Sequence, residues 1–140
     1  LREFPQYLTL LFEIDALTLN DDRHLNNIAV IERSGKYDYC PIFDNGAGLM
    51  SNLQVYSADI EPSGLIPTIK ARPFNVSFNR QMSTMRGLYG QQLRIAKLTK
   101  SEIEAMLAPL LEYYPKYLRG IICDRVMCCI LTRLRDCTKV

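Results

Sequence analysis

The sequence lacks the features that tie many proteins to a zinc ion, a membrane or a disulfide framework. It has a single histidine, and none of its five cysteines forms a C-x-x-C pair, so a zinc site and a disulfide scaffold are both disfavoured. Its longest apolar run, Val126 to Leu131, is far shorter than the ~20 residues that a membrane-spanning helix needs. No secretory signal is visible. We therefore expect no membrane contact and a location in the reducing cytoplasm.

The sequence also lacks a strong charge of either sign. Its 17 Lys and Arg residues are nearly balanced by 15 Asp and Glu residues, which gives a net charge of +2. Electrostatic binding of nucleic acid needs a concentrated basic face. The basic residues between Lys70 and Lys100 are interpreted instead as a solvated face, and we expect no direct contact with nucleic acid.

Length and composition indicate an ordinary globular protein. A chain of 140 residues that is 48% hydrophobic can bury about two thirds of its unfolded surface, so we expect a single domain over residues 1–140. The chain begins at Leu1 inside an amphipathic pattern, and we interpret it as a piece of a longer polypeptide. Four cysteines that follow residue 120 are expected to be small apolar side chains on a buried helix face: Cys123, Cys128, Cys129 and Cys137.

The first third of the chain alternates apolar and polar segments. Apolar residues at spacings of three and four predict a helix from Phe4 to about Leu19. The polar stretch 20–27, with three Asn, two Asp and the only His, predicts a loop. Two β-rich runs, 28–31 and 37–42, flank turn residues and predict a β-hairpin over 28–42. The hairpin delivers the chain to the segment 43–48.

The remaining sequence predicts a loop-rich excursion followed by helices. Gly and Pro residues interrupt 44–78, whereas 79–137 is expected to form a helical bundle with helices at 79–92, 100–113 and 115–136. A cap at Thr99 or Ser101 opens the second of these helices, whose apolar stripe includes Met106 and Leu110. The predicted fold class is therefore mainly α with a small β-hairpin.

Three polar residues have the order that phosphoryl transfer requires. A kinase needs a carboxylate base and, five positions later on the same loop, an Asn that binds magnesium, followed across a hairpin by a metal-binding Asp. Asp22 and Asn27 have this spacing, and the predicted hairpin returns Asp44 beside them. Amide and carboxylate oxygens suit Mg²⁺, which needs few protein ligands when phosphate is present. The sequence therefore predicts Asp22 as base and Asn27 and Asp44 as ligands of Mg²⁺ and ATP.

Two neighbouring residues compete for roles in this loop. Asp21 is an alternative base, but the spacing to Asn27 favours Asp22. His24 could act as a general base or as a metal ligand, yet no second His or Cys lies near it in the sequence. We favour His24 as a residue that organises the loop, by a hydrogen bond to the backbone or to a metal-binding Asp.

These residues resemble a known family. The string Asp22-Arg23-His24-Leu25-Asn26-Asn27, followed by Tyr39-Cys40-Pro41-Ile42-Phe43-Asp44, resembles the catalytic loop and metal-binding segment of HipA-like serine/threonine kinases, the toxins of bacterial persistence modules. The resemblance covers about residues 3–80. It implies the helical C-terminal lobe of a protein-kinase-like fold, with Asp22 as catalytic base and His24 supporting the loop. Asn27 and Asp44 would hold magnesium.

The resemblance also implies partners. They are ATP, a protein substrate with a Ser or Thr acceptor, an antitoxin-like regulator, and an N-terminal lobe of the parent chain that would cover the phosphates. Because neither that covering loop nor its Lys can be placed in the sequence, the isolated chain is expected to be inactive.

Two other interpretations stay open. One is a lipid kinase, because the string from Asp22 to Asn27 is also similar to the catalytic loop of phosphatidylinositol kinases. The other is a non-catalytic interaction domain derived from a kinase lobe.

Overall fold

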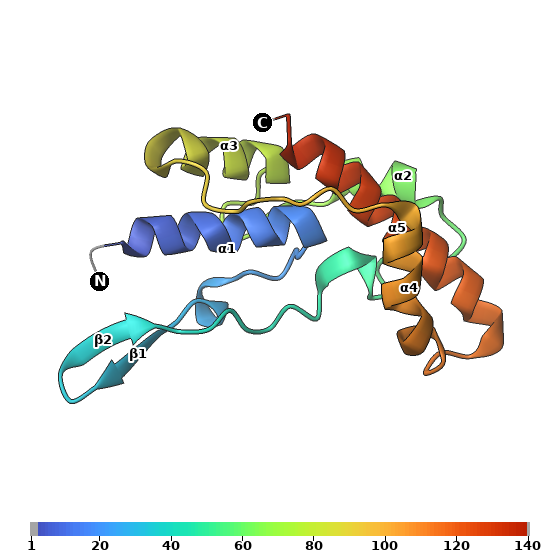
Figure 1. The fold of residues 1–140 in the computed structure, drawn as a ribbon, viewed down its shortest axis with the longest axis horizontal. Helices are drawn as coiled ribbons and strands as arrows, with labels where there is room; N and C mark the ends of the chain where they lie inside the picture. Colours follow the sequence, from blue (N-terminus) through green and yellow to red (C-terminus); the bar gives the residue numbers. More distant parts are fainter. Residues whose placement is uncertain (1–2, 140) are drawn as a thin grey trace.

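The computed structural model describes residues 3–139 and is mainly helical with one small sheet (Figure 1). The predicted fold class, helices with a β-hairpin, is confirmed at this level. The elements in chain order are α1 (Phe4–Thr18), β1 (Val30–Arg33), β2 (Lys36–Tyr39), α2 (Pro62–Leu65), α3 (Phe78–Tyr89), α4 (Lys100–Leu111) and α5 (Lys116–Cys137). Three 3₁₀ turns, η1 (Leu25–Asn27), η2 (Gly48–Met50) and η3 (Ile66–Thr68), lie between them.

Helix α1 carries the loop that follows it. Pro5 stands in its first turn, where a missing N–H costs nothing. The helix stops at Leu19, which adopts the left-handed conformation (φ 55°) and whose N–H donates to the carbonyl of Asp15. The predicted end near Leu19 is therefore confirmed, and the chain turns sharply into the polar loop.

The predicted hairpin is present, with its strands placed slightly differently along the chain. Val30 pairs with Tyr39 and Arg33 with Lys36 in an antiparallel register. The two-residue loop Ser34-Gly35 has positive φ at both positions (52° and 77°), which matches the right-handed twist of the strands. In Figure 1 the hairpin projects from the helices, and the Tyr7 hydroxyl anchors its exit by donating to the Cys40 carbonyl at 2.6 Å.

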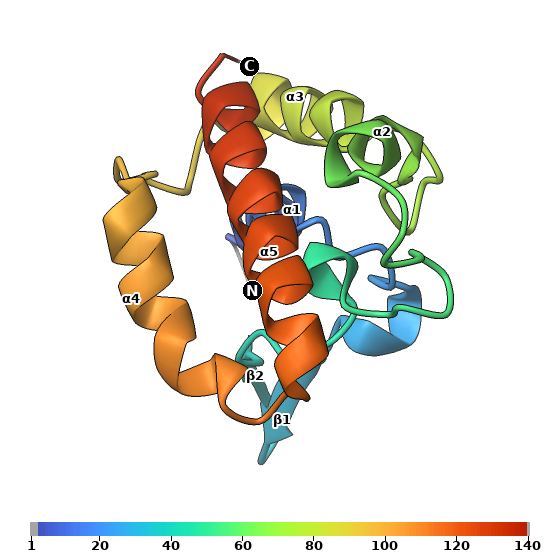
Figure 2. The same ribbon diagram turned by 90° about the vertical axis from the view of Figure 1, so that its right-hand side faces the viewer.

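The core lies where α1, α3 and α5 meet the turns η2 and η3 (Figure 2). Its fully buried members include Ala16, Met50, Met82 and Cys129. Cys137 is buried as well, whereas Cys123 and Cys128 are half-buried, so the expected role as apolar filler is confirmed for two of the four. Burial raises the pKa of both buried thiols.

The last helices have nearly the predicted bounds, but one predicted face is wrong. Helix α4 begins after Thr99, and its capping box with Glu102 explains the start. Only Ile103 of its apolar stripe is buried, while Met106 and Leu110 are more than half exposed. The reason is that α4 packs mainly against α5, at the outside of the bundle (Figure 2).

The excursion 44–78 is loop-rich, as predicted, and contains only short turns besides α2.

A buried ion pair of α1 fixes the irregular segment between α3 and α4. Glu13 accepts a hydrogen bond from Arg86 at 2.5 Å and two more from the backbone N–H groups of Gln92 and Leu93. Within residues 3–139, no helix combines the length and the apolar character needed to cross a membrane.

Candidate functional site

A buried ion pair between α1 and the loop 20–27 forms the base of the candidate site. Arg23 and Asp15 are 0% and 1% exposed, and two guanidinium nitrogens, Nε and Nη2, donate to the two carboxylate oxygens at 2.9 and 3.0 Å. Asn20 donates to the same carboxylate at 3.0 Å. Burial raises the pKa of Asp15, and these donors oppose the shift by stabilising its charge. The geometry is the bidentate pairing that an Arg makes best.

The remaining donors of Arg23 join the two predicted motifs. Its Nη1 donates to the Asn27 carbonyl at 3.0 Å and to the Phe43 carbonyl at 2.7 Å. Its Nη2 donates to the Asn45 side-chain oxygen at 2.6 Å. One guanidinium therefore binds the end of the loop 20–27 and both neighbours of Asp44. The sequence prediction that the hairpin returns Asp44 beside Asn27 agrees with this arrangement.

Asn27 is nearly buried and its side chain is oriented. The amide nitrogen donates to the Asp22 carbonyl at 3.0 Å, and the side chain is 6% exposed. Because the nitrogen is engaged, the amide oxygen points to the other side. No described residue donates a hydrogen bond to that oxygen, so it can accept an external ligand.

Asp44 is exposed and lies in a turn between two anchored residues. Its backbone is left-handed (φ 54°), a conformation that Asp tolerates better than most residues. The turn continues to Gly48, where a Cβ would meet the Thr18 carbonyl oxygen at 3.2 Å. The absence of a side chain at Gly48 therefore lets this segment pack closely against the end of α1.

The two acidic residues that compete for the role of base differ in their surroundings. The Asp21 carboxylate accepts a hydrogen bond from the Tyr56 hydroxyl, whose pKa is raised by burial and by that carboxylate. The Asp22 side chain is 59% exposed, and its only close ionic neighbour among the described residues is the His24 ring at 3.9 Å. Asp22 is thus the carboxylate available for proton transfer, in keeping with the spacing argument.

The His24 ring makes no hydrogen bond within residues 3–139, so the role of His24 as organiser of the loop stays a prediction. The backbone N–H of His24 donates to the Asp22 carbonyl at 2.8 Å, while its ring is 47% exposed beside the Asp22 carboxylate. Arg23, which sequence reasoning passed over, makes the contacts that organise the loop. The sequence did hint at this role of Arg23, because an Arg eight positions after Asp15 can reach back to the helix. Residue type alone, however, does not distinguish a buried Arg from a solvated one.

The donor set fits magnesium better than a transition metal. Within the described part of the chain, no three His, Cys, Asp or Glu side chains gather as a metal site. Asn27 and Asp44 offer one amide and one carboxylate oxygen, which are hard ligands. Two such ligands suffice for Mg²⁺ only when phosphate oxygens and water complete its octahedron.

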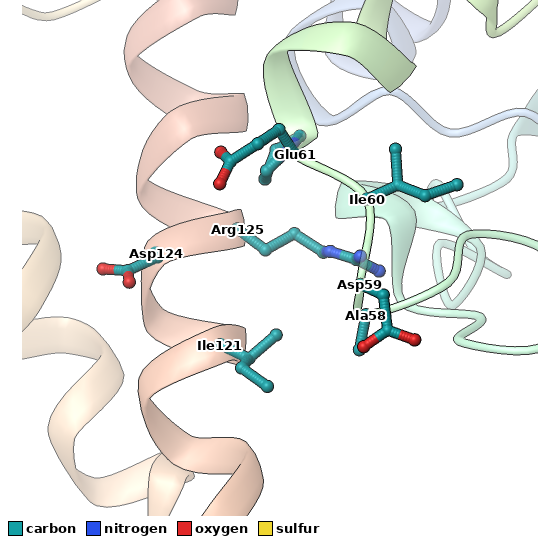
Figure 3. A pocket seen from close by; sticks show the side chains of 8 residues that line it. Ala58, Asp59, Ile60, Glu61, Ile121, Asp124 and Arg125 are labelled. Atoms are coloured by element: carbon teal, nitrogen blue, oxygen red, sulfur yellow. The ribbon is translucent and has the colours of Figure 1, made fainter.

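A second buried Arg holds the segment that follows the candidate metal residues. Arg125 extends from α5 toward residues 58–60, while Asp124 points away from it (Figure 3). Its guanidinium donates to the carbonyls of Met50, Tyr56 and Ser57 at 3.3, 2.6 and 2.6 Å. The segment that carries Tyr56 is therefore fixed to α5 through its backbone.

Comparison with protein-family models, curated proteins and solved structures found no match to this chain.

Proposed function

We propose that the chain is the catalytic lobe of an ATP- and magnesium-dependent phosphotransferase of the HipA-like serine/threonine kinase type. The observation that carries this proposal is the Arg23 guanidinium, which binds the Asn27 carbonyl and both neighbours of Asp44. This contact supports the proposal, because it joins the loop that carries Asp22 and Asn27 to the segment that carries Asp44. Phosphoryl transfer needs positioned groups of these kinds and little covalent help from the protein.

Each residue has one role in the proposed reaction. Asn27 and Asp44 would hold Mg²⁺, which would neutralise negative charge on the ATP phosphates. Asp22 accepts the proton of the Ser or Thr hydroxyl while the hydroxyl oxygen forms its bond to the γ-phosphorus and the bond from that phosphorus to ADP breaks. His24, whose ring lies 3.9 Å from the Asp22 carboxylate, supports the loop. The N-terminal lobe supplies the phosphate-covering loop, and an antitoxin-like regulator is the expected partner.

The test is phosphoryl transfer by the complete gene product. Asp22→Asn should abolish transfer but leave Mg²⁺-dependent ATP binding in place, whereas Asp44→Asn should abolish that binding. Asp59→Asn, an exposed carboxylate outside both segments, is the matched control. Transfer retained in both the Asp22 and the Asp44 variant would overturn the proposal.

A second candidate is a non-catalytic interaction domain, and one observation favours it. An apolar groove of about 370 Å³ lies between α1 and α3 and includes Phe12, Leu25, Phe74 and Leu88. Leu25, Phe74 and Leu88 are all more than 60% exposed. Exposed apolar side chains in one groove are typical of a protein-binding surface. A complete gene product that binds no ATP, yet loses a partner when Leu88→Glu is introduced, would support this alternative.

A further inference from the structure

An open cavity of about 260 Å³, lined by polar and apolar side chains, lies beside the candidate base. Its lining includes Asp21 and Asp22 from the loop 20–27, Asn52 and Tyr56 from the following excursion, and Arg72. The metal candidates Asn27 and Asp44 are not among its lining residues. The cavity is also smaller than the ~300 Å³ at which pockets for whole small-molecule ligands begin. Its size suits a single substrate side chain.

The two acids of the cavity are not equivalent. Tyr56 donates its hydroxyl hydrogen to Asp21, and the Tyr56 carbonyl is itself held by Arg125 at 2.6 Å. The Asp21 carboxylate is therefore engaged by the protein itself and lines the cavity as a structural residue. Asp22 keeps its carboxylate exposed, so it is the acid that can accept a proton from a hydroxyl in the cavity.

Arg72 is the one cation in this lining, and it is exposed to solvent. The backbone on either side is fixed: the Arg72 carbonyl accepts from the Gln81 side chain at 2.9 Å, and Ala71 N–H donates to the Val76 carbonyl at 2.7 Å. The Arg72 guanidinium has no ion-pair or hydrogen-bond partner among residues 3–139, although Asp21 and Asp22 line the same cavity. A planar fork of donors in this position matches a carboxylate.

We propose that this cavity is the acceptor site, and that Arg72 selects a Ser or Thr followed or preceded by an acidic residue. The proposal rests on the proposed function, because it takes Asp22 as the base. The acceptor hydroxyl lies at Asp22 and gives it its proton as the oxygen bonds to the γ-phosphorus of ATP. The neighbouring carboxylate of the peptide pairs with Arg72 and fixes the register of the chain.

The test is peptide binding by the complete gene product without nucleotide, measured by titration calorimetry. The probes are two heptapeptides with a central Ser, one flanked by Glu residues and the other by Lys residues. The wild-type protein should prefer the Glu peptide, and Arg72→Glu should weaken that binding about ten-fold and favour the Lys peptide. Lys70→Glu makes the same charge change two residues away, outside the cavity, and should alter neither affinity.

Each outcome has a defined meaning. Equal binding of both peptides, or binding of neither, overturns the acceptor site. The proposal is also overturned if Lys70→Glu loses the preference for the Glu peptide as Arg72→Glu does. A diffuse basic face, and not Arg72 itself, would then cause the preference. If the protein shows no preference between the peptides but binds phosphatidylinositol vesicles in an Arg72-dependent way, the peptide proposal is overturned in favour of a lipid acceptor. Because no nucleotide is present, a failure here is distinguishable from a failure of Mg²⁺-dependent ATP binding.

Discussion

Two buried arginines, Arg23 and Arg125, hold two different regions of this molecule in different ways. Arg23 is paired with a buried carboxylate and joins the loop 20–27 to the segment 43–48. Arg125 is 2% exposed and donates to three carbonyls, and none of its hydrogen bonds within the described chain is to a carboxylate. Removing Arg23 leaves a buried charge behind, whereas removing Arg125 leaves only neutral groups.

A charge pair therefore supports the candidate site, whereas side-chain hydrogen bonds to backbone carbonyls support the segment beside it. The two regions meet at Tyr56, whose carbonyl accepts from Arg125 and whose hydroxyl donates to Asp21. Variants of Arg23, Arg125 and Tyr56 can therefore separate the contribution of the charge pair from that of the hydrogen bonds to the backbone.

The largest effect is expected for Arg23→Met. It leaves the Asp15 carboxylate buried without its ionic partner and should lower the free energy of unfolding by about 3–5 kcal/mol. Urea denaturation measures this. Adding Asp15→Leu should recover part of the lost stability, since both charges are then gone, but should not recover ATP binding, because Asn27 and Asp44 lose their common anchor. A double variant less stable than Arg23→Met would contradict the charge-pair interpretation.

A smaller loss is expected for Arg125→Met. The variant removes three donors but leaves no buried charge, so the free energy of unfolding should fall by about 1–3 kcal/mol. The same denaturation experiment applies, with Arg135→Met, an exposed residue of α5, as the control. If Arg125→Met costs as much as Arg23→Met, the distinction between the two regions does not hold.

Tyr56→Phe should cost less again, about 1 kcal/mol, because it removes one hydrogen bond and keeps the ring. Its main value is in a double-mutant cycle with Arg125→Met. Since both residues position the same segment, their effects should be coupled. Additive losses would show that Arg125 and the Tyr56 hydroxyl act independently.

The last prediction concerns Cys129, one turn after Arg125 on α5, and affects the free energy of unfolding only at alkaline pH. Burial raises the pKa of its thiol from 9.0 to about 12, and Arg125 opposes that shift. Between pH 9 and 12 the unfolded chain releases this proton while the folded chain keeps it, so the free energy of unfolding should fall as pH rises. Cys129→Ala should make that fall shallower, and Arg125→Met should extend it to higher pH. Cys123→Ala is the control, and equal slopes in all variants would refute the assignment.

The fold was largely predictable because its signals are local. Spacing of apolar residues gave α1 and α5, and the Ser34-Gly35 turn gave the hairpin. The exposed stripe of α4 was not predictable, because an amphipathic pattern does not say how many neighbours cover it. Met106 and Leu110 had the pattern of core residues but have α5 on one side only.

The candidate site residues could be named from their order in the sequence, whereas the contacts that support them could not. Asp22, Asn27 and Asp44 stand out by residue type and spacing. The pairing of Arg23 with Asp15 and the cavity beside Arg72 arise from long-range packing, since Asn45 and Phe43 reach Arg23 only after the hairpin forms. Such contacts have no local sequence pattern.

The central claim is that Asn27 and Asp44 bind one divalent cation together with nucleotide phosphate. The most direct measurement replaces Mg²⁺ by paramagnetic Mn²⁺ in the presence of ADP and follows line broadening of the backbone amides by NMR. The account predicts broadening centred on residues 27 and 44 that disappears in Asp44→Asn. Broadening centred elsewhere, or unchanged in the variant, would contradict it.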